Sequence, residues 1–283
     1  MKISVIIPAK NEENYLPTLL EEIEKQADHE PKIETIVAVA PSIDDTIGIA
    51  RKFSVKAVMG GLPGIGRNAG AKIATGEILF FLDADVVLSG DFFRNAVSEF
   101  SRRGLDIASV QLRTDSKNII DRIYFSVNRA AVRLSMLLGT PYLPGACMIV
   151  KREKFRASGG FDESLTFSED AELTRRIAAL GARFGILSSC YAIASNRRFV
   201  KEGRFRTGAR FLSTVFKNLR GTKIRQKGYY FAGNELWNFE NWQNKWNGYI
   251  SRMKRTSRSN RRRARKIARR ISAKMLRKRQ KYP

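Results

Sequence analysis

The sequence has almost no histidine or cysteine and no long apolar run. It contains one histidine and two cysteines in 283 residues, which argues against a zinc-binding or disulfide-rich protein. Cys147 and Cys190 lie in apolar stretches and are expected to be reduced core residues. No segment reaches the roughly 18 uncharged apolar residues of a membrane span, and the apolar run ISVII ends at Pro8, so we expect no signal peptide.

Acidic residues are missing from one end of a strongly basic chain. The formal net charge is +25, and residues 250–283 contain 16 Lys and Arg but no Asp or Glu. Apolar residues recur there at helical spacing, which predicts a basic amphipathic helix or a disordered tail that binds an anionic membrane surface. Nucleic acid is the alternative partner, and a solubilising role is a third option. The aromatic segment 221–249 that connects to this tail has no motif that we can assign.

Strand-like and helix-like patterns alternate along the first 110 residues. Short apolar runs typical of buried strands are separated by amphipathic stretches typical of helices. This order predicts an α/β fold with a mostly parallel central sheet flanked by helices. Ligands bind beyond the carboxyl ends of such strands. Three loops are expected at that edge, namely residues 8–12, 41–45 and 83–85.

The stretch FLDADVVL places Asp83 and Asp85 where an apolar strand should end. Alternate residues share one face of a strand, so the two carboxylates point the same way. Carboxylate oxygens are the ligands that Mg²⁺ and Mn²⁺ prefer. The stretch therefore has the outline of a divalent-cation site, and a solvated turn after a strand is the alternative.

The glycine-rich stretch GGLPGIGRNAGA, residues 60–71, is not a dinucleotide-binding fingerprint. The third glycine of G-x-G-x-x-G would fall at Ala69, and the stretch follows the third expected strand instead of the first. We interpret it as a flexible loop that brings Arg67 and the backbone N–H groups of a helix start toward a phosphate.

Five stretches, in this order and spacing, resemble the inverting family 2 glycosyltransferases with the GT-A fold. They are VIIPAKNEE, SIDDT, GRNAGAKIATGEILFFLDAD, PGACMIVKREKFRASGGFDE and SEDAELTRRIAALG, and they lie within roughly residues 1–200. The resemblance implies a GT-A nucleotide-diphospho-sugar transferase domain over residues 1–220, with a basic helical extension after it. Its donor nucleotide half would be residues 1–110 and its acceptor half residues 111–220.

The resemblance also implies an activity. A sugar would pass from a nucleotide-sugar donor to an acceptor hydroxyl or a lipid phosphate, and the acceptor would be lipid-linked, a glycan or a protein. Asp83 and Asp85 correspond to the D-x-D element that holds Mn²⁺ or Mg²⁺, and Asp170 corresponds to the catalytic base. Together with the basic tail, this implies a cytoplasmic enzyme at the periphery of the membrane.

Further side chains are expected around these carboxylates. The cation would neutralise the leaving diphosphate, and the base would deprotonate the attacking hydroxyl. The residues expected to bind the donor are Pro8, Ala9, Glu12, Asp44, Arg67 and Asp83. The residues expected to contact a phosphate or the acceptor are Glu169, Arg197 and Arg198.

Some features leave other interpretations open. Val39, Ala40 and Pro41 stand where the family usually has acidic residues that contact the nucleotide base. Asp44 and the acidic residues 169–170 also suit helix caps. The whole chain could instead be a non-catalytic glycosyltransferase-like protein that binds nucleic acid or membrane, or a nucleotidyltransferase.

Residues 118–139 form an amphipathic stretch interrupted by Arg122, Arg129 and Arg133. A helix of this kind either lies on a bilayer or turns its apolar side to the core. The sequence alone does not choose between the two.

Overall fold

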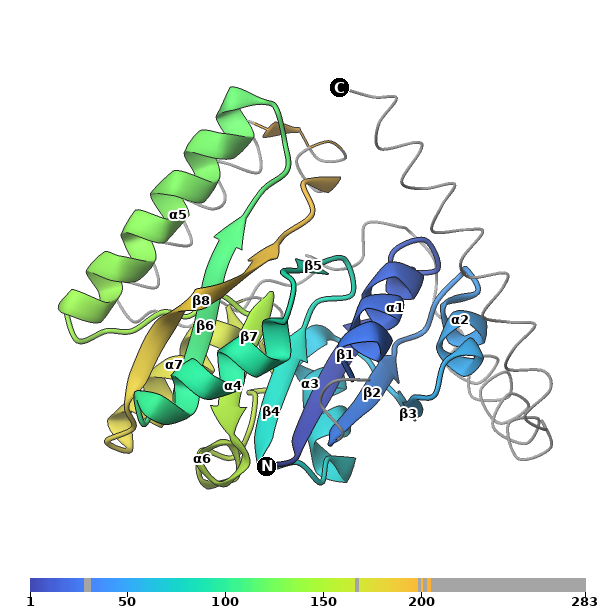
Figure 1. Cartoon of the computed structure of the whole chain (residues 1–283), viewed down its shortest axis with the longest axis horizontal. Coiled ribbons are helices and arrows are strands. Elements are labelled where there is room, and N and C mark those ends of the chain that lie inside the picture. Colours follow the sequence, from blue (N-terminus) through green and yellow to red (C-terminus); the bar gives the residue numbers. More distant parts are fainter. Residues whose placement is uncertain (28–31, 166–167, 198–199, 201–202, 205–283) are drawn as a thin grey trace.

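The computed structural model describes residues 1–27, 32–165, 168–197, 200 and 203–204. They form an α/β fold in which helices cover both faces of a central β-sheet (Figure 1). The segments 221–249 and 250–283 and the domain boundary at residue 220 lie outside the described residues. Our expectations for them therefore stay predictions.

Eight strands form one sheet in the order β3-β2-β1-β4-β7-β6-β8-β5. Six of them point the same way, and β7 and β5 run against their neighbours. The expected mostly parallel sheet is therefore confirmed. The strands are β1 Ile3–Ala9, β2 Ile33–Val39, β3 Lys56–Met59, β4 Ile78–Leu82, β5 Val87–Leu88, β6 Ile107–Arg113, β7 Cys147–Lys151 and β8 Phe184–Ile193.

The helices of the described residues divide between the two faces of the sheet (Figure 1). Apolar residues of α1, α2, α4 and α5 pack into one hydrophobic cluster, and those of α6 and α7 pack into a second cluster with residues at the end of α3. The helices are α1 Leu16–Ala27, α2 Thr46–Lys52, α3 Pro63–Ile73, α4 Phe92–Arg102, α5 Ile119–Leu137, α6 Arg152–Ala157 and α7 Glu169–Ala179.

The central strand β4 is apolar throughout because helices cover both of its faces. Phe80 packs against Phe93 of α4, with ring centroids 5.4 Å apart. The next residue, Phe81, turns to the other face and packs against Phe161, with centroids 5.1 Å apart. All five residues of β4 are buried, which explains the continuous run ILFFL before Asp83.

Helix α3 begins earlier than expected, so the interpretation of residues 60–71 as a flexible loop was wrong. Pro63 occupies the first turn, where its fixed φ favours a helix. The glycines of this stretch serve close packing on the sheet. A Cβ atom at Gly70 would lie only 2.4 Å from a side-chain carbon of Ile6 in β1. Arg67 is therefore held on a rigid helix that rests against β1.

The fold also bears on the expectations for the two cysteines and for membrane-spanning helices. Cys147 and Cys190 are free and buried, as predicted for core residues. In the part of the chain that the structure describes, no helix combines the length and the apolar character needed to cross a bilayer.

Candidate active site

The carboxylates singled out in the sequence gather at the carboxyl ends of the parallel strands. Asp83 follows β4, Glu12 lies in the loop after β1, and Arg197 follows β8. The antiparallel strand β7 starts at the same edge, where the N–H of Asp83 donates to the carbonyl of Ala146 at 3.0 Å. The loop before β7 and the start of α7 thereby come next to the D-x-D element.

Arg67 connects the D-x-D element to the start of α7. Its side chain is only 4% exposed, and its Nη2 donates to Oδ1 of Asp83 at 2.9 Å. Its Nη1 donates to Oε1 of Glu169 at 2.5 Å. The same guanidinium donates to the carbonyl of Gly145 at 3.3 Å and lies 5.4 Å from the centroid of the Phe161 ring. Arg67 thus fixes two acidic residues, which the interpretation of an open phosphate-binding loop did not anticipate.

Asp170 is held by two backbone N–H groups. Gly145 donates to its Oδ2 at 2.7 Å, and Ala171 donates to its Oδ1 at 2.8 Å. The pKa of Asp170 is raised to about 6, chiefly by burial and also by the charge of Glu169, while Arg67 and the backbone hydrogen bonds oppose the rise. A fixed carboxylate of this pKa is ionised at neutral pH and can accept a proton from a bound hydroxyl.

Arg197 forms a second centre of positive charge between Glu12 and Asp85. Its Nη1 donates to Oε2 of Glu12 at 2.7 Å, its Nη2 donates to the other oxygen, and its Nε pairs with Oδ2 of Asp85 at 2.9 Å. The guanidinium also lies 4.9 Å from the centroid of the Tyr15 ring. The pKa of Glu12 is raised to about 7, chiefly by burial and also by the charges of Asp85 and Asp83, although Arg197 opposes the rise.

The donor atoms at this edge suit Mg²⁺ or Mn²⁺. Asp83 and Asp85 offer hard oxygen ligands, and Arg197 already places a positive charge beside Asp85, as a bound cation would. Among the residues described, no group of three or more Asp, Glu, His and Cys side chains is arranged to hold a metal. The two aspartates would therefore form only part of a coordination shell, which substrate phosphate and water complete in many magnesium sites.

Asp44 joins the loop after β2 to the loop after β1. Its Oδ1 accepts a hydrogen bond from the N–H of Thr46 at 3.0 Å, and its Oδ2 accepts one from the N–H of Glu13 at 3.1 Å. Thr46 in turn accepts from the N–H of Glu12 at 2.8 Å. These bonds position Glu12. Donor binding by Asp44 stays a prediction.

The other predicted donor-binding residues offer less to a ligand. Ala9 is 2% exposed, and its carbonyl accepts from the N–H of Ala40 at 2.8 Å. Pro8 lies beneath α3, where a Cβ atom at Gly66 would be 3.3 Å from it. Arg198 is outside the described residues. The roles of these residues in donor binding therefore stay predictions.

Sequence reasoning missed the part that Gly145 plays. Its N–H holds Asp170, and a Cβ atom at this position would lie 2.9 Å from Oδ2 of the same aspartate. The stretch PGACMIV contains this glycine, but nothing local ties it to a residue 25 positions further on. Phe161, beside Arg67, was missed for the same reason.

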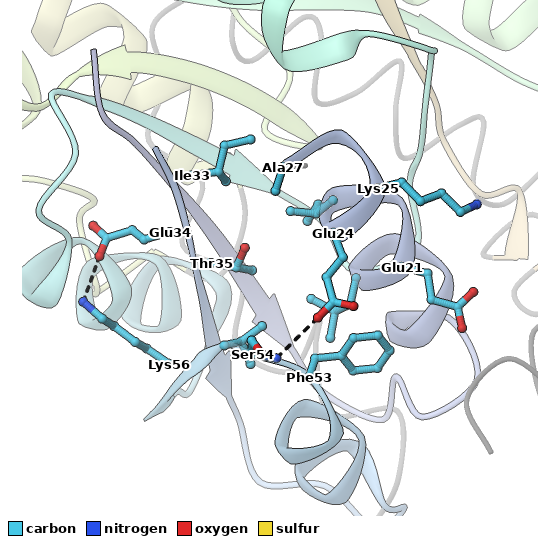
Figure 2. A pocket seen from close by; sticks show the side chains of 13 residues that line it. Glu21, Glu24, Lys25, Ala27, Ile33, Glu34, Thr35, Phe53, Ser54 and Lys56 are labelled. Carbon is cyan, nitrogen blue, oxygen red and sulfur yellow. Dashed lines mark hydrogen bonds and ion pairs between the residues drawn. The ribbon is translucent and has the colours of Figure 1, made fainter. Parts of the chain in front are cut away.

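A separate pocket lies at the opposite end of the sheet, between the end of α1 and the starts of β2 and β3 (Figure 2). Its charged side chains are already engaged there. Glu24 accepts from the N–H of Ser54 at 3.5 Å, and Lys56 pairs with Glu34 at 2.8 Å. The pocket does not contain any of the carboxylates described above.

The comparisons with known proteins agree on one family. Residues 4–159 match the family model described as glycosyl transferase family 2. Poly(ribitol-phosphate) beta-N-acetylglucosaminyltransferase TarS of Staphylococcus aureus is 29% identical over 121 residues, which are 40% of this chain and 21% of TarS. The 4,4'-diaponeurosporenoate glycosyltransferase of Staphylococcus haemolyticus is 38% identical over 104 residues, 34% of this chain and 27% of that protein. The matches thus span about a quarter or less of these relatives.

Solved structures agree on the fold. The mannosyltransferase PcManGT from Pyrobaculum calidifontis, in complex with GDP-Man and Mn²⁺, has a TM-score of 0.62 and 23% identity, covering 80% of this chain and 66% of PcManGT. TarS 1–349 of S. aureus in complex with UDP-GlcNAc has a TM-score of 0.58 and 23% identity, covering 77% of this chain and 67% of that one. At this identity the likeness shows the fold alone, and it confirms the predicted GT-A fold.

Proposed function

Because the chain belongs to glycosyl transferase family 2, we propose that it is an inverting enzyme that transfers a sugar from a nucleotide-sugar donor to an acceptor hydroxyl or lipid phosphate. One observation carries the proposal. Arg67 binds both Asp83 and Glu169, and so the D-x-D element and Asp170 lie at the same edge of the sheet. Complexes of two fold relatives with UDP-GlcNAc and with GDP-Man support a nucleotide-sugar donor.

Asp83 and Asp85 would hold Mn²⁺ or Mg²⁺, whose charge would stabilise the departing diphosphate. Arg197 would assist by binding a phosphate oxygen, because the two nitrogens that now face Glu12 match phosphate as well as carboxylate. The Nε of Arg197, which pairs with Asp85, would then keep the side chain at this edge. The Mn²⁺ in the PcManGT complex supports a divalent ion in this family's fold.

Asp170 would act as the base. The acceptor oxygen would attack the sugar carbon from the side opposite the diphosphate, the bond between that carbon and the phosphate oxygen would break, and the acceptor proton would pass to the carboxylate of Asp170. The N–H groups of Gly145 and Ala171 keep the carboxylate in one orientation. The raised pKa makes it a stronger base than an ordinary aspartate.

The acceptor and the place of action follow from weaker observations. The two curated relatives are named for different acceptors, poly(ribitol-phosphate) and diaponeurosporenoate. We propose a lipid-linked, glycan or protein acceptor for this chain, reached by a cytoplasmic enzyme at the periphery of the membrane. The strong positive charge of the chain supports this place of action.

A panel of nucleotide sugars tests the proposed function directly. The full chain is incubated with each donor and with candidate acceptors, with and without Mn²⁺ or Mg²⁺, and glycosylated product is detected by mass spectrometry. We expect one donor to be consumed with a divalent ion present, and expect the Asp170→Asn variant to be inactive with it. A chain that binds no nucleotide sugar but binds anionic vesicles or nucleic acid would support the non-catalytic alternative.

A further inference from the structure

Helix α5 exposes a row of large apolar residues. Its buried side carries Phe125 and Val132 together with three polar residues, Asp121, Asn128 and Ser135, which are 0%, 7% and 1% exposed. Large apolar residues lie on the opposite side, and we call them the α5 apolar face. They are Ile119, Ile120, Ile123, Val127, Leu134, Leu137 and the adjoining Leu138, all between 37% and 85% exposed. A surface helix normally turns large apolar residues toward the core and polar residues toward solvent, so something apolar is expected to cover this face.

Hydrogen bonds and an ion pair on the inner side fix the rotation of α5. Oδ2 of Asp121 accepts from the hydroxyl of Ser116 at 2.6 Å, and its Oδ1 pairs with Nε of Arg204 at 3.0 Å. At the other end, the hydroxyl of Ser135 accepts from the N–H of Tyr142 at 3.0 Å. Rotating the helix to bury its apolar face would break these bonds and leave a buried carboxylate unpaired, which is costly. The outward direction of the apolar face is therefore built into the fold.

The surroundings of the α5 apolar face are positively charged. Arg122, Arg129 and Arg133 follow one another along one flank of the apolar residues, given 3.6 residues per helical turn. The only acidic residue within α5 is the buried Asp121. An apolar strip bordered by arginines is the pattern of a helix that lies in the interface of an anionic membrane.

The charge pattern also disfavours two other occupants of the α5 apolar face, namely the basic tail of the same chain and a second copy of the protein. Residues 250–283 contain 16 Lys and Arg and no Asp or Glu, so this tail repels the arginines of α5. A second copy packed through the same face would bring two rows of arginines together. An anionic lipid surface instead attracts the arginines.

We propose that the α5 apolar face binds the surface of an anionic lipid bilayer, with the helix axis parallel to the membrane. The apolar side chains would enter the boundary between head groups and acyl chains, and the arginines would contact lipid phosphates. At 19 residues the helix is about 28 Å long, and it is not apolar enough to cross a bilayer. This binding does not require sugar transfer and is measured without donor.

Two leucines of nearly equal exposure provide a matched test. Leu134 on α5 is 47% exposed, and Leu180 at the end of α7 is 49% exposed. The full chain and its Leu134→Glu and Leu180→Glu variants are floated with phosphatidylcholine vesicles that contain phosphatidylglycerol. We expect Leu134→Glu to weaken binding about tenfold and Leu180→Glu to leave it unchanged. Equal binding by all three proteins, or equal loss in both variants, would overturn the proposal.

A fluorescent label locates the contact even if another segment also binds the vesicles. Both native cysteines are buried, so Leu134→Cys and Leu180→Cys can each be labelled selectively with an environment-sensitive dye. We expect a blue shift at residue 134 on addition of anionic vesicles, and none at residue 180 or with neutral vesicles.

Three results of the labelling experiment would overturn the proposal. The first is the absence of any shift at residue 134. The second is a shift without lipid that grows with protein concentration, which would show that a second copy covers the face. The third is protection of the label from iodide quenching in dilute protein without lipid, which would show that the chain covers the face itself.

Discussion

The guanidinium of Arg67 lies 2.9 Å from Asp83, yet the arginine is 4% exposed and the aspartate 35% exposed. The pair thus joins a buried cation to a carboxylate that still faces solvent. One oxygen of Asp83 is fixed by the ion pair, and the rest of the carboxylate remains available at the edge of the sheet. This arrangement lets a single aspartate belong both to the folded framework and to the proposed metal site.

Removing the charge of either aspartate in the D-x-D element should abolish transfer. We expect Asp83→Asn and Asp85→Asn to lower kcat at least about 100-fold, because each removes charge from the site of the leaving group. Asp91→Asn is a suitable control, since Asp91 is 58% exposed in a surface pair with Arg94. Steady-state kinetics with each divalent ion gives the answer. Full activity in excess chelator would contradict the assignment.

Asp170→Asn should separate proton transfer from donor binding. We expect kcat to fall about 10²–10⁴-fold while donor affinity, measured by calorimetry, stays the same. In the wild type, kcat should fall as the pH drops below about 6, where Asp170 becomes protonated. Glu169→Gln should keep this acidic limb and lose less activity. Loss of donor binding in both variants to the same degree would indicate a structural role.

Gly145→Ala should displace the proposed base without changing any charge. The added Cβ would lie 2.9 Å from Cβ and Oδ2 of Asp170, closer than real contacts allow. A displacement of about 1 Å near the reacting atoms costs about 100-fold in rate. Gly90→Ala is the control, because nothing lies within 4 Å of a Cβ atom there. Equal kcat in the two variants would show that Asp170 tolerates the displacement.

Arg67→Met should destabilise the fold. It leaves the buried carboxylate of Glu169 without its cation, and breaking a buried pair in this way costs about 3–5 kcal/mol. Arg94→Met, which breaks a surface pair, should cost about 1 kcal/mol or less. Urea unfolding measures both. Adding Glu169→Gln to Arg67→Met should recover part of the loss, and an unchanged unfolding midpoint in Arg67→Met would refute the structural role.

Glu12 should make stability depend on pH. Its pKa is raised from 4.5 to about 7 in the folded chain, so between these values the folded state binds more protons than the unfolded state. The stability of the wild type relative to Glu12→Gln should therefore fall as the pH rises from about 4.5 to 7 and then level off. Thermal unfolding across this range tests the sign. A difference that grows in favour of the wild type would show that Arg197 dominates over burial.

The elements that could be predicted are those whose pattern is local. The run ILFFL before Asp83 indicates a strand because both faces of β4 are covered, and the parallel order follows from the alternation of strands and helices. The place of β7 between β4 and β6 is different. It depends on contacts between distant segments, and nothing in the five residues of β7 states which strands they join.

The residues of the site also fall into those that the sequence predicts and those that it does not. Asp83 and Asp85 could be predicted because they follow an apolar run, and Glu12 and Asp170 because of the family resemblance. Their partners are distant in sequence. Arg67 and Glu169 are 102 residues apart, and Arg197 and Glu12 are 185 residues apart. Only the folded sheet brings these pairs together, and hence sequence reasoning did not anticipate that Arg67 lies between two carboxylates. A contact of Arg67 with the donor stays a prediction.

The position of β7 has a consequence for synthesis of the chain. Strand β4 lies at the middle of the sheet, but its neighbour on one side is made about 65 residues later. Until residues 147–151 emerge, this apolar and fully buried strand has an open edge that can pair with other chains. A nascent or truncated chain that ends before β7 is therefore an aggregation hazard.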